Sequence, residues 1–189
     1  VKQEEKSMTD HTKLIMHREE VRVSDKELLK GILDLTSVCC VGFQDEPYPY
    51  IVPMNYGYVW EDKLTFYFHM AKEGHRLELL KKDPHVCVNV PVFLDRVGKK
   101  SYRKETHDYR SVMAYGTGEI LDPRVDEEEY KYGFSLLCTH TGRPPVRKIT
   151  AEMYQRLYIL KITADVVTGK SQYPIETLDE VKMPPLQDK

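Results

Sequence analysis

The stretch FYFHMAKEGHRLELLKKDP, residues 66–84, predicts a strand followed by a short helix. Apolar side chains alternate from Phe66 to Met70, which is typical of a strand with one buried face. Gly74 then permits a tight turn, and leucines and charged residues continue to Pro84, which would end a helix. Both the predicted fold and the predicted site build outward from this strand and helix.

The start of the helix carries His75 and Arg76, and Lys72 comes just before it. Positive charge is unfavourable at this end of a helix, where the dipole is itself positive. Backbone amides at a helix N-terminus, together with a guanidinium, suit a phosphate group. We therefore predict a phosphate site made by Gly74, His75 and Arg76, reinforced by Lys72. The alternative is a solvated Arg76 paired with a glutamate of the same segment.

His69 is the second candidate, because it ends the predicted strand on the face opposite the apolar side chains. Tyr67 shares that face. An imidazole titrates near neutral pH, so His69 could orient a planar ring system or deliver a proton. The alternative is a structural histidine that hydrogen-bonds to a neighbouring strand.

The flanking segments predict further strands as antiparallel neighbours. Residues 48–60 alternate as one long strand, interrupted near Pro53 and Gly57, where a bulge, a bend or an open edge is expected. A turn joins this strand to residues 64–70 as a hairpin. The other predicted strands are residues 37–43, 85–93, 109–122 and 156–170, and residues 94–108 are predicted to be an exposed charged loop.

Two more helices complete the pattern. Ser24 is predicted to cap a helix that has Glu27 at the capping-box position, and the acids after Asp126 are predicted to open a helix that reaches His140. Strands dominate, and Gly and Pro bends recur inside them. The sequence therefore predicts a mainly β protein, a closed or half-closed antiparallel barrel with peripheral helices.

Length and composition limit the classes of function. The 189 residues suffice for one domain, for which we expect a flexible segment at 1–20, a barrel domain at 21–172 and a C-terminal tail at 173–189. A net charge of -2 predicts no nucleic-acid or anionic membrane partner. With no long apolar run and no secretory signal, a cytoplasmic location is expected. The four cysteines lack a zinc-binding spacing, so no metal site is predicted.

Four segments in order resemble the 5-nitroimidazole antibiotic resistance (Nim) group within the pyridoxamine 5'-phosphate oxidase-like, FMN-binding split barrels. They are PYIVPMNYGY (49–58), FYFHMAKEGHRLELLKKDPHVCVNV (66–90), YRSVMAYGTGEI (109–120) and ILKITADVVTGK (159–170). The resemblance covers about residues 20–172. It implies a six-stranded split barrel that forms a homodimer, with two flavins in the grooves between subunits.

The resemblance also implies the residues that contact the flavin. The strand like VPMNYG contacts the ring, the strand end like FHMA flanks the ring and ribityl chain, and basic residues after the glycine hold the phosphate. Arg76 stands where members of the group commonly have lysine, which retains the charge. The implied residues are Pro53, Met54, Asn55, His69, Met70, Ala71, Gly74, His75, Arg76 and Ser111.

The activity implied is flavin-dependent reduction of small nitroaromatic compounds, with His69 as the proton source. FMN is the implied cofactor and FAD is possible. NAD(P)H would be a transient electron donor, because no G-x-G-x-x-G motif follows a strand. A non-catalytic flavin-binding or redox-sensing module and a heme-binding split barrel remain alternatives. The end of the chain lacks the arginine-rich segment of the vitamin-oxidising enzymes, which counts against that reaction.

Overall fold

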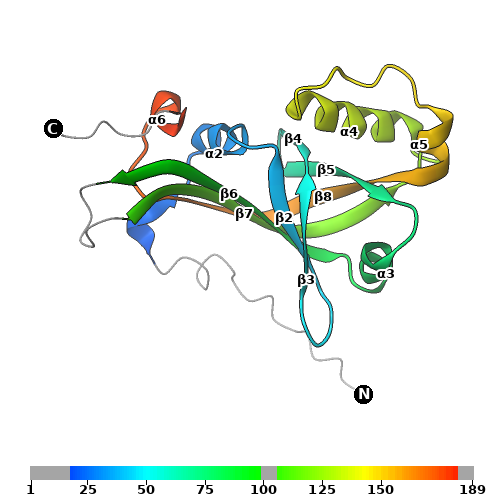
Figure 1. Ribbon diagram of the computed structural model, residues 1–189, viewed down its shortest axis with the longest axis horizontal. Helices are drawn as coiled ribbons and strands as arrows, with labels where there is room; N and C mark the ends of the chain where they lie inside the picture. The colour runs from blue at the N-terminus through cyan, green and yellow to red at the C-terminus, as the bar shows by residue number, and fades with distance from the viewer. Residues whose placement is uncertain (1–17, 99–105, 183–189) are drawn as a thin grey trace.

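The computed structural model describes residues 18–98 and 106–182, and one curled antiparallel sheet of eight strands forms its centre (Figure 1). The strand order is β3-β2-β6-β7-β8-β5-β4, and β1 pairs with β8 outside this path. The strands are β1 (Arg22–Val23), β2 (Val38–Phe43), β3 (Tyr50–Asn55), β4 (Gly57–Trp60), β5 (Leu64–Ala71), β6 (His85–Gly98), β7 (Thr106–Leu121) and β8 (Leu157–Ser171).

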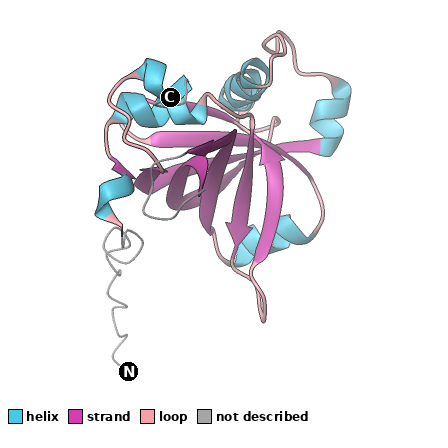
Figure 2. Ribbon diagram, turned by 60° about the vertical axis from the view of Figure 1, so that its left-hand side comes forward, coloured by secondary structure: helices cyan, strands magenta, loops and turns pink. Residues whose placement is uncertain are grey.

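The two edge strands of the sheet, β3 and β4, are consecutive in the chain and are separated only by Tyr56. A sheet whose first and last strands are joined by one residue must curl until its edges approach, and β3 does contact β5. Figure 2 shows the resulting half-barrel. The Tyr56 side chain is fully buried at the junction, and its hydroxyl donates to the carbonyl oxygen of Leu33 over 2.6 Å. The predicted half-closed barrel is therefore confirmed.

The concave face of the sheet holds the main core, since alternate residues of each strand point inward. In β5 these are Leu64, Phe66, Phe68 and Met70, the four residues that the sequence assigned to the buried face. The other strands add buried aliphatic side chains, including Val41, Val88, Val90, Val112, Leu160 and Ile162.

The helices lie around the sheet: α4 and α5 on one side of β5, α3 on the other, and α2 and α6 together at the far end (Figures 1 and 2). They are η1 (Glu19–Val21, a 3-10 helix), α2 (Lys26–Leu33), α3 (His75–Lys82), α4 (Glu127–His140), α5 (Ala151–Arg156) and α6 (Leu178–Lys182). None of the helices among the described residues is long and apolar enough to cross a membrane.

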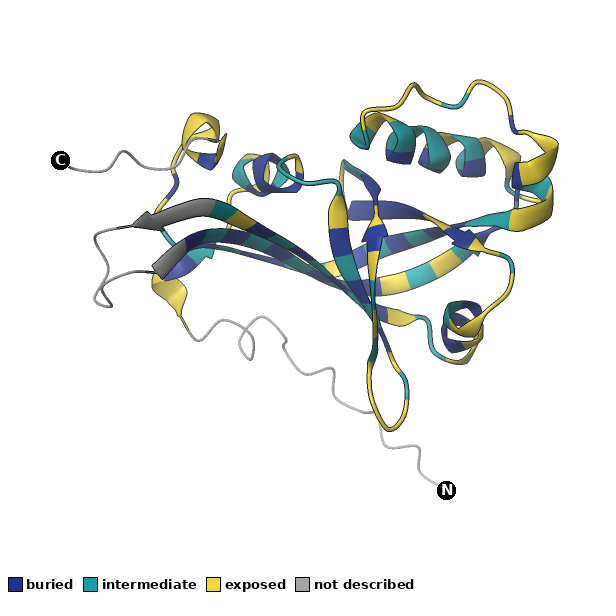
Figure 3. Ribbon diagram, viewed as in Figure 1, coloured by how far each residue is buried: buried dark blue, intermediate teal, exposed yellow. Residues whose placement is uncertain are grey.

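Two glycines let α4 approach the sheet closely. A Cβ atom at Gly57 of β4 would overlap the backbone of Leu136 and Leu137, and a Cβ atom at Gly133 of α4 would overlap the ring of Tyr67. As a result Tyr67, on the convex face of β5, is only 3% exposed. The side of α4 that faces the sheet is buried, whereas the loop that joins β2 and β3, residues 44–49, is largely exposed (Figure 3).

The structure also corrects several details of the sequence interpretation. All six predicted strands are present, but the long one divides at Tyr56 into β3 and β4, and the two-residue β1 is added. β6 and β7 extend into residues 94–108, so the predicted loop is shorter than expected. Asp25, not Ser24, caps α2, because the Asp25 carboxylate accepts from the Leu28 amide over 2.9 Å.

The ends of the chain are only partly described. The flexibility predicted for the N-terminal segment falls mainly on residues 1–17, which lie outside the described residues. Residues 173–182, assigned to the C-terminal tail, include the unpredicted α6, whose fully buried Val181 packs against Gly31 of α2. The unpredicted α5 lies just before β8.

Candidate functional site

The start of α3 is open and uncapped. Gly74, the residue before the helix, has φ 113°, a conformation that favours glycine. No side chain of the described residues caps the helix, and a Cβ atom at Gly74 would meet nothing within 4 Å. Leu77 and Glu78 already donate to the carbonyl oxygen of Gly74, whereas the amides of His75 and Arg76 have no acceptor among the described residues and remain available to an anion.

Arg76, in the first turn of α3, is half-buried. Its Nη1 donates to Sδ of Met54 over 3.3 Å. Within residues 18–98 and 106–182, no carboxylate lies within ion-pair distance of Arg76, and Glu78 pairs instead with Lys81 at 3.0 Å. The alternative in which a neighbouring glutamate neutralises Arg76 is thus not found, and its guanidinium keeps hydrogen-bonding capacity for an anion.

His75 begins α3 but its ring is already engaged. Its Nε2 lies 2.7 Å from Oδ2 of Asp45, and the edge of its ring contacts the ring of Tyr50 at 5.0 Å between centroids. The hydrogen bond to His75 and that from the Glu46 amide lower the pKa of the Asp45 carboxyl. These contacts hold the β2–β3 hairpin against α3, and they occupy the ring of His75 but not its backbone amide.

Lys72 does not join the predicted phosphate site. Its Nζ donates to Oδ1 of Asp122 over 3.2 Å and lies 4.4 Å from the centre of the Tyr158 ring. Burial alone would raise the pKa of Asp122, but hydrogen bonds from the Arg124 amide and from Lys72 lower it. Lys72 therefore anchors the connection between β5 and α3 to the end of β7.

His69 lies on the convex face of β5, two residues beyond the covered Tyr67, and it is exposed. Its ring makes no hydrogen bond to a described residue, so the alternative of a structural hydrogen bond to a neighbouring strand is not found. The protein around the ring and the positive charges of Arg76 and Arg143 lower the pKa of His69 below its usual value. This shift favours the neutral form of the imidazole.

The remaining residues implied by the resemblance fall into two groups. Pro53 and Asn55 are exposed on β3, and Ala71 is exposed at the end of β5. Met54 and Met70 are 7% and 2% exposed, so their side chains belong to the core, and the Met54 side chain meets the site through its Sδ, which accepts from Arg76. The Asn55 amide donates to the carbonyl oxygen of Ser37 over 3.0 Å.

Ser111 is distant from the rest of the site within one chain. On β8, the partner of His69 is Ile159 and the partner of Ser111 is Lys170. These partners are separated by about 35 Å along the strand, at roughly 3.3 Å per residue. One copy of the chain therefore brings together His69, Arg76 and the β3 residues, but not Ser111.

Sequence reasoning missed Arg143, in the loop after α4. The only signal for it was the basic character of residues 143–148, which carry no motif. It also missed Asp45 and Asp122, the partners of His75 and Lys72.

The fold and the site together define a split-barrel protein with an exposed histidine beside an uncapped, basic helix start. Comparison with known proteins agrees with this class. The family model for pyridoxamine 5'-phosphate oxidase matches residues 25–171, and the chain belongs to this family. No curated protein matches.

Several solved structures are similar to this chain. A candidate 5-nitroimidazole antibiotic resistance protein from Bacteroides thetaiotaomicron has 25% identity and a TM-score of 0.68, covering 80% of this chain and 86% of that one. An FAD and heme binding protein from Mycobacterium smegmatis has 19% identity and a TM-score of 0.64, covering 86% and 79%. An FAD-binding protein from Mesorhizobium loti has 20% identity and a TM-score of 0.57, covering 80% and 97%. The last two support the fold alone.

Proposed function

We propose that this protein binds a flavin and reduces small nitroaromatic compounds. The observation that carries the proposal is an arginine at the open start of α3 that has no carboxylate partner among the described residues, together with His69, whose ring makes no hydrogen bond to a described residue and whose pKa the charge of that arginine lowers. Family membership and the likeness to the Bacteroides protein favour the same reading. FMN is the first choice of cofactor, and FAD is the second.

The residues present fit a flavin phosphate. The Arg76 guanidinium and the first amides of α3 would hold it, and the open space at Gly74 leaves room for close approach. The exposed surface formed by Asn55, His69 and Ala71 would then lie beside the ring system. A bound flavin supplies the hydride or electron transfer, with NAD(P)H as transient donor.

The contribution of the protein is orientation, exclusion of water and a proton. His69 is the proposed proton source, because it is the titratable group on the surface assigned to the ring. Its lowered pKa means that the charged, acidic form accumulates only at acidic pH, while the neutral ring can still donate one hydrogen bond at neutral pH.

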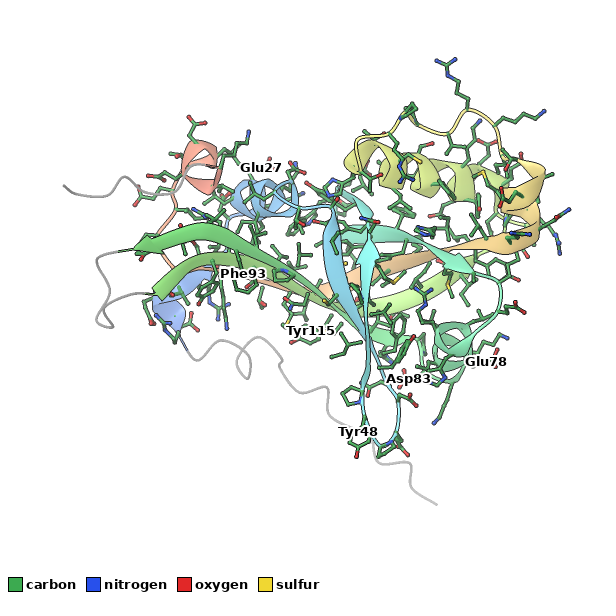
Figure 4. The ribbon with its side chains drawn as sticks, viewed as in Figure 1. Glu27, Tyr48, Glu78, Asp83, Phe93 and Tyr115 are labelled. Carbon is green, nitrogen blue, oxygen red and sulfur yellow. The ribbon has the colours of Figure 1, made fainter. Side chains whose placement is uncertain are left out.

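A second copy of the chain would complete the site. The convex face of β3-β2-β6-β7 exposes Val38, Ile51 and Phe93, and Ser111 lies on the same face, beside Pro91 of β6. Figure 4 shows Phe93 and Tyr115 along this part of the sheet. If two copies pair through this face, Ser111 of one copy can approach the His69 and Arg76 of the other. A homodimer with shared flavin sites is therefore part of the proposal.

The experiment is to purify the protein, identify any bound chromophore by absorption and mass, reduce it without oxygen and mix it with a 5-nitroimidazole. With the reduced protein in more than threefold excess over the compound, flavin reoxidation with amine formation is the expected result, because a nitro group takes up six electrons on its way to an amine and each reduced flavin gives two. A reduced flavin that stays inert would leave a flavin-binding or redox-sensing module. A heme spectrum without flavin would overturn the proposal.

A further inference from the structure

Two arginines from different parts of the chain lower the pKa of His69 through their charge. Arg76 comes from α3, and Arg143 comes from the loop that follows α4. In Figure 1, α3 lies on one side of β5, and α4 with the loop that follows it lies on the other. The positive charges of both arginines act on the His69 ring, and no described carboxylate does.

The fold fixes the turn that carries Arg143. The C-terminal half of α4 packs directly on Gly57, which pairs with Tyr67, two residues before His69. His140 is the last residue of α4, and its Nε2 lies 3.0 Å from the carbonyl oxygen of Thr36. Gly142 then turns the chain with φ 74°, and the Arg143 amide donates to the carbonyl oxygen of Cys138 over 2.8 Å. The turn is therefore held over the same edge of the barrel as His69.

Arg143 is not neutralised by the protein. Its side chain is exposed, and within the described ranges no carboxylate forms an ion pair with it. The other basic groups nearby differ in this respect, since Lys72 pairs with Asp122 and His75 with Asp45. Arg76 is already assigned to the flavin phosphate, so Arg143 is a second, unused guanidinium beside the histidine.

We propose that Arg143 is a specificity-determining residue that binds a carboxylate or another fixed negative charge on the substrate, so that small anionic nitroaromatic compounds are preferred. This inference rests on the proposed function. A guanidinium binds a carboxylate through paired, charge-assisted hydrogen bonds, which a neutral compound of the same shape cannot accept equally well.

The test compares 4-nitrobenzoate with its neutral analogue 4-nitrobenzamide on the flavin-loaded protein. Dissociation constants come from titration calorimetry, and kcat/KM is measured beside them. Wild type is expected to bind the anion more tightly than the amide. The substitution Arg143→Gln is expected to weaken binding of the anion roughly tenfold or more, while the dissociation constant of the amide changes less than about twofold. Arg143→Lys should restore part of the preference, and added salt should weaken anion binding only where residue 143 is charged.

Arg147→Gln is the matched control, because Arg147 is an exposed arginine of the same loop with no charge effect on His69. If Arg143→Gln leaves the ratio of the two dissociation constants unchanged, or if Arg147→Gln lowers it equally, the inference is wrong. Loss of flavin in Arg143→Gln would also overturn it, by assigning the guanidinium to the diphosphate of an FAD. A preference for the anion in binding without turnover would refute the reductase activity and leave the inference standing.

Discussion

The convex face of the sheet has two regions that differ in what covers them. Over β4 and β5, α4 lies so close that Gly57 and Gly133 leave no room for a Cβ atom, and Tyr67 is buried. Over β2, β3 and β6, no described helix covers the face, and Val38, Ile51 and Phe93 are 45%, 62% and 76% exposed.

The difference indicates that each region has a different task. The covered region is packed within one chain, whereas the uncovered face keeps exposed apolar side chains that the proposed association of two copies would bury. His69 lies where the cover ends, since Tyr67 is beneath α4 and His69 is exposed. The candidate site is therefore at the boundary of the two regions, where a second copy could close it.

The largest effect is expected in the covered region. Gly57→Ala would push a methyl group into the backbone of α4, and because backbone cannot move aside easily, we expect a loss of at least about 3 kcal/mol of unfolding free energy. Gly42→Ala is the control on the uncovered face, where the nearest atoms lie 3.8 Å from the added Cβ and a change within about 1 kcal/mol is expected. Urea unfolding measures the unfolding free energy of both variants, and an equal loss in the two would contradict the difference between the covered and the uncovered region.

The next effect concerns association through the uncovered face. Phe93→Asp places a charge on this face, and we expect dimer formation to weaken by about 2 to 4 kcal/mol while the monomer stays folded. Val125→Asp, at an equally exposed residue before α4, should leave association unchanged. Sedimentation equilibrium measures the dimer dissociation constant of both variants. An unaltered dimer in Phe93→Asp would show that the uncovered face is not the interface.

The third effect concerns flavin binding at the candidate site, where the covered and uncovered regions meet. Removal of the Arg76 guanidinium should weaken flavin binding by about 1.5 to 3 kcal/mol, the usual worth of a hydrogen bond to a charged group. Fluorescence titration with FMN measures the change in Arg76→Ala. Lys81→Ala in the last turn of α3 is the control, since Lys81 pairs with Glu78 far from the open helix start. Unchanged affinity in Arg76→Ala would remove the residue from the site.

The fourth and smallest effect is the pH dependence due to His69. Its pKa is lower in the folded chain than in the unfolded chain, so the unfolded state binds more protons and stability falls as pH drops through about 6.5. His69→Gln should lose less unfolding free energy than wild type over this range. If the variant loses equally much, the pKa of His69 is not lowered by folding.

Much of this fold could be predicted from local sequence. Alternation in residues 64–70 assigned both faces of β5 correctly, and the Pro53 to Gly57 interruption marks the point where the two sheet edges meet. The short α5 was missed because its capping box has Met153 where the usual signature has Glu or Gln. The ends of β6 and β7 were missed because charged residues there conceal the strand pattern.

The candidate site was predicted less completely, for a physical reason. His69 and Arg76 could be found because strand alternation and the helix dipole are local. The partners of Lys72 and His75 lie 50 and 30 residues away in sequence and are brought close only by folding. Arg143 is a further case, because only the packing of α4 on Gly57 places its loop beside β5.

The central claim is that each flavin site is shared, with Arg76 from one copy and Ser111 from the other. The most direct measurement mixes two variants, Arg76→Glu and Ser111→Glu, neither of which should bind FMN alone. After subunit exchange, mixed dimers contain one intact site each, so about a quarter of the wild-type FMN binding should return. If FMN binding stays absent although native mass spectrometry shows mixed dimers, the two residues do not meet across an interface and the claim is wrong.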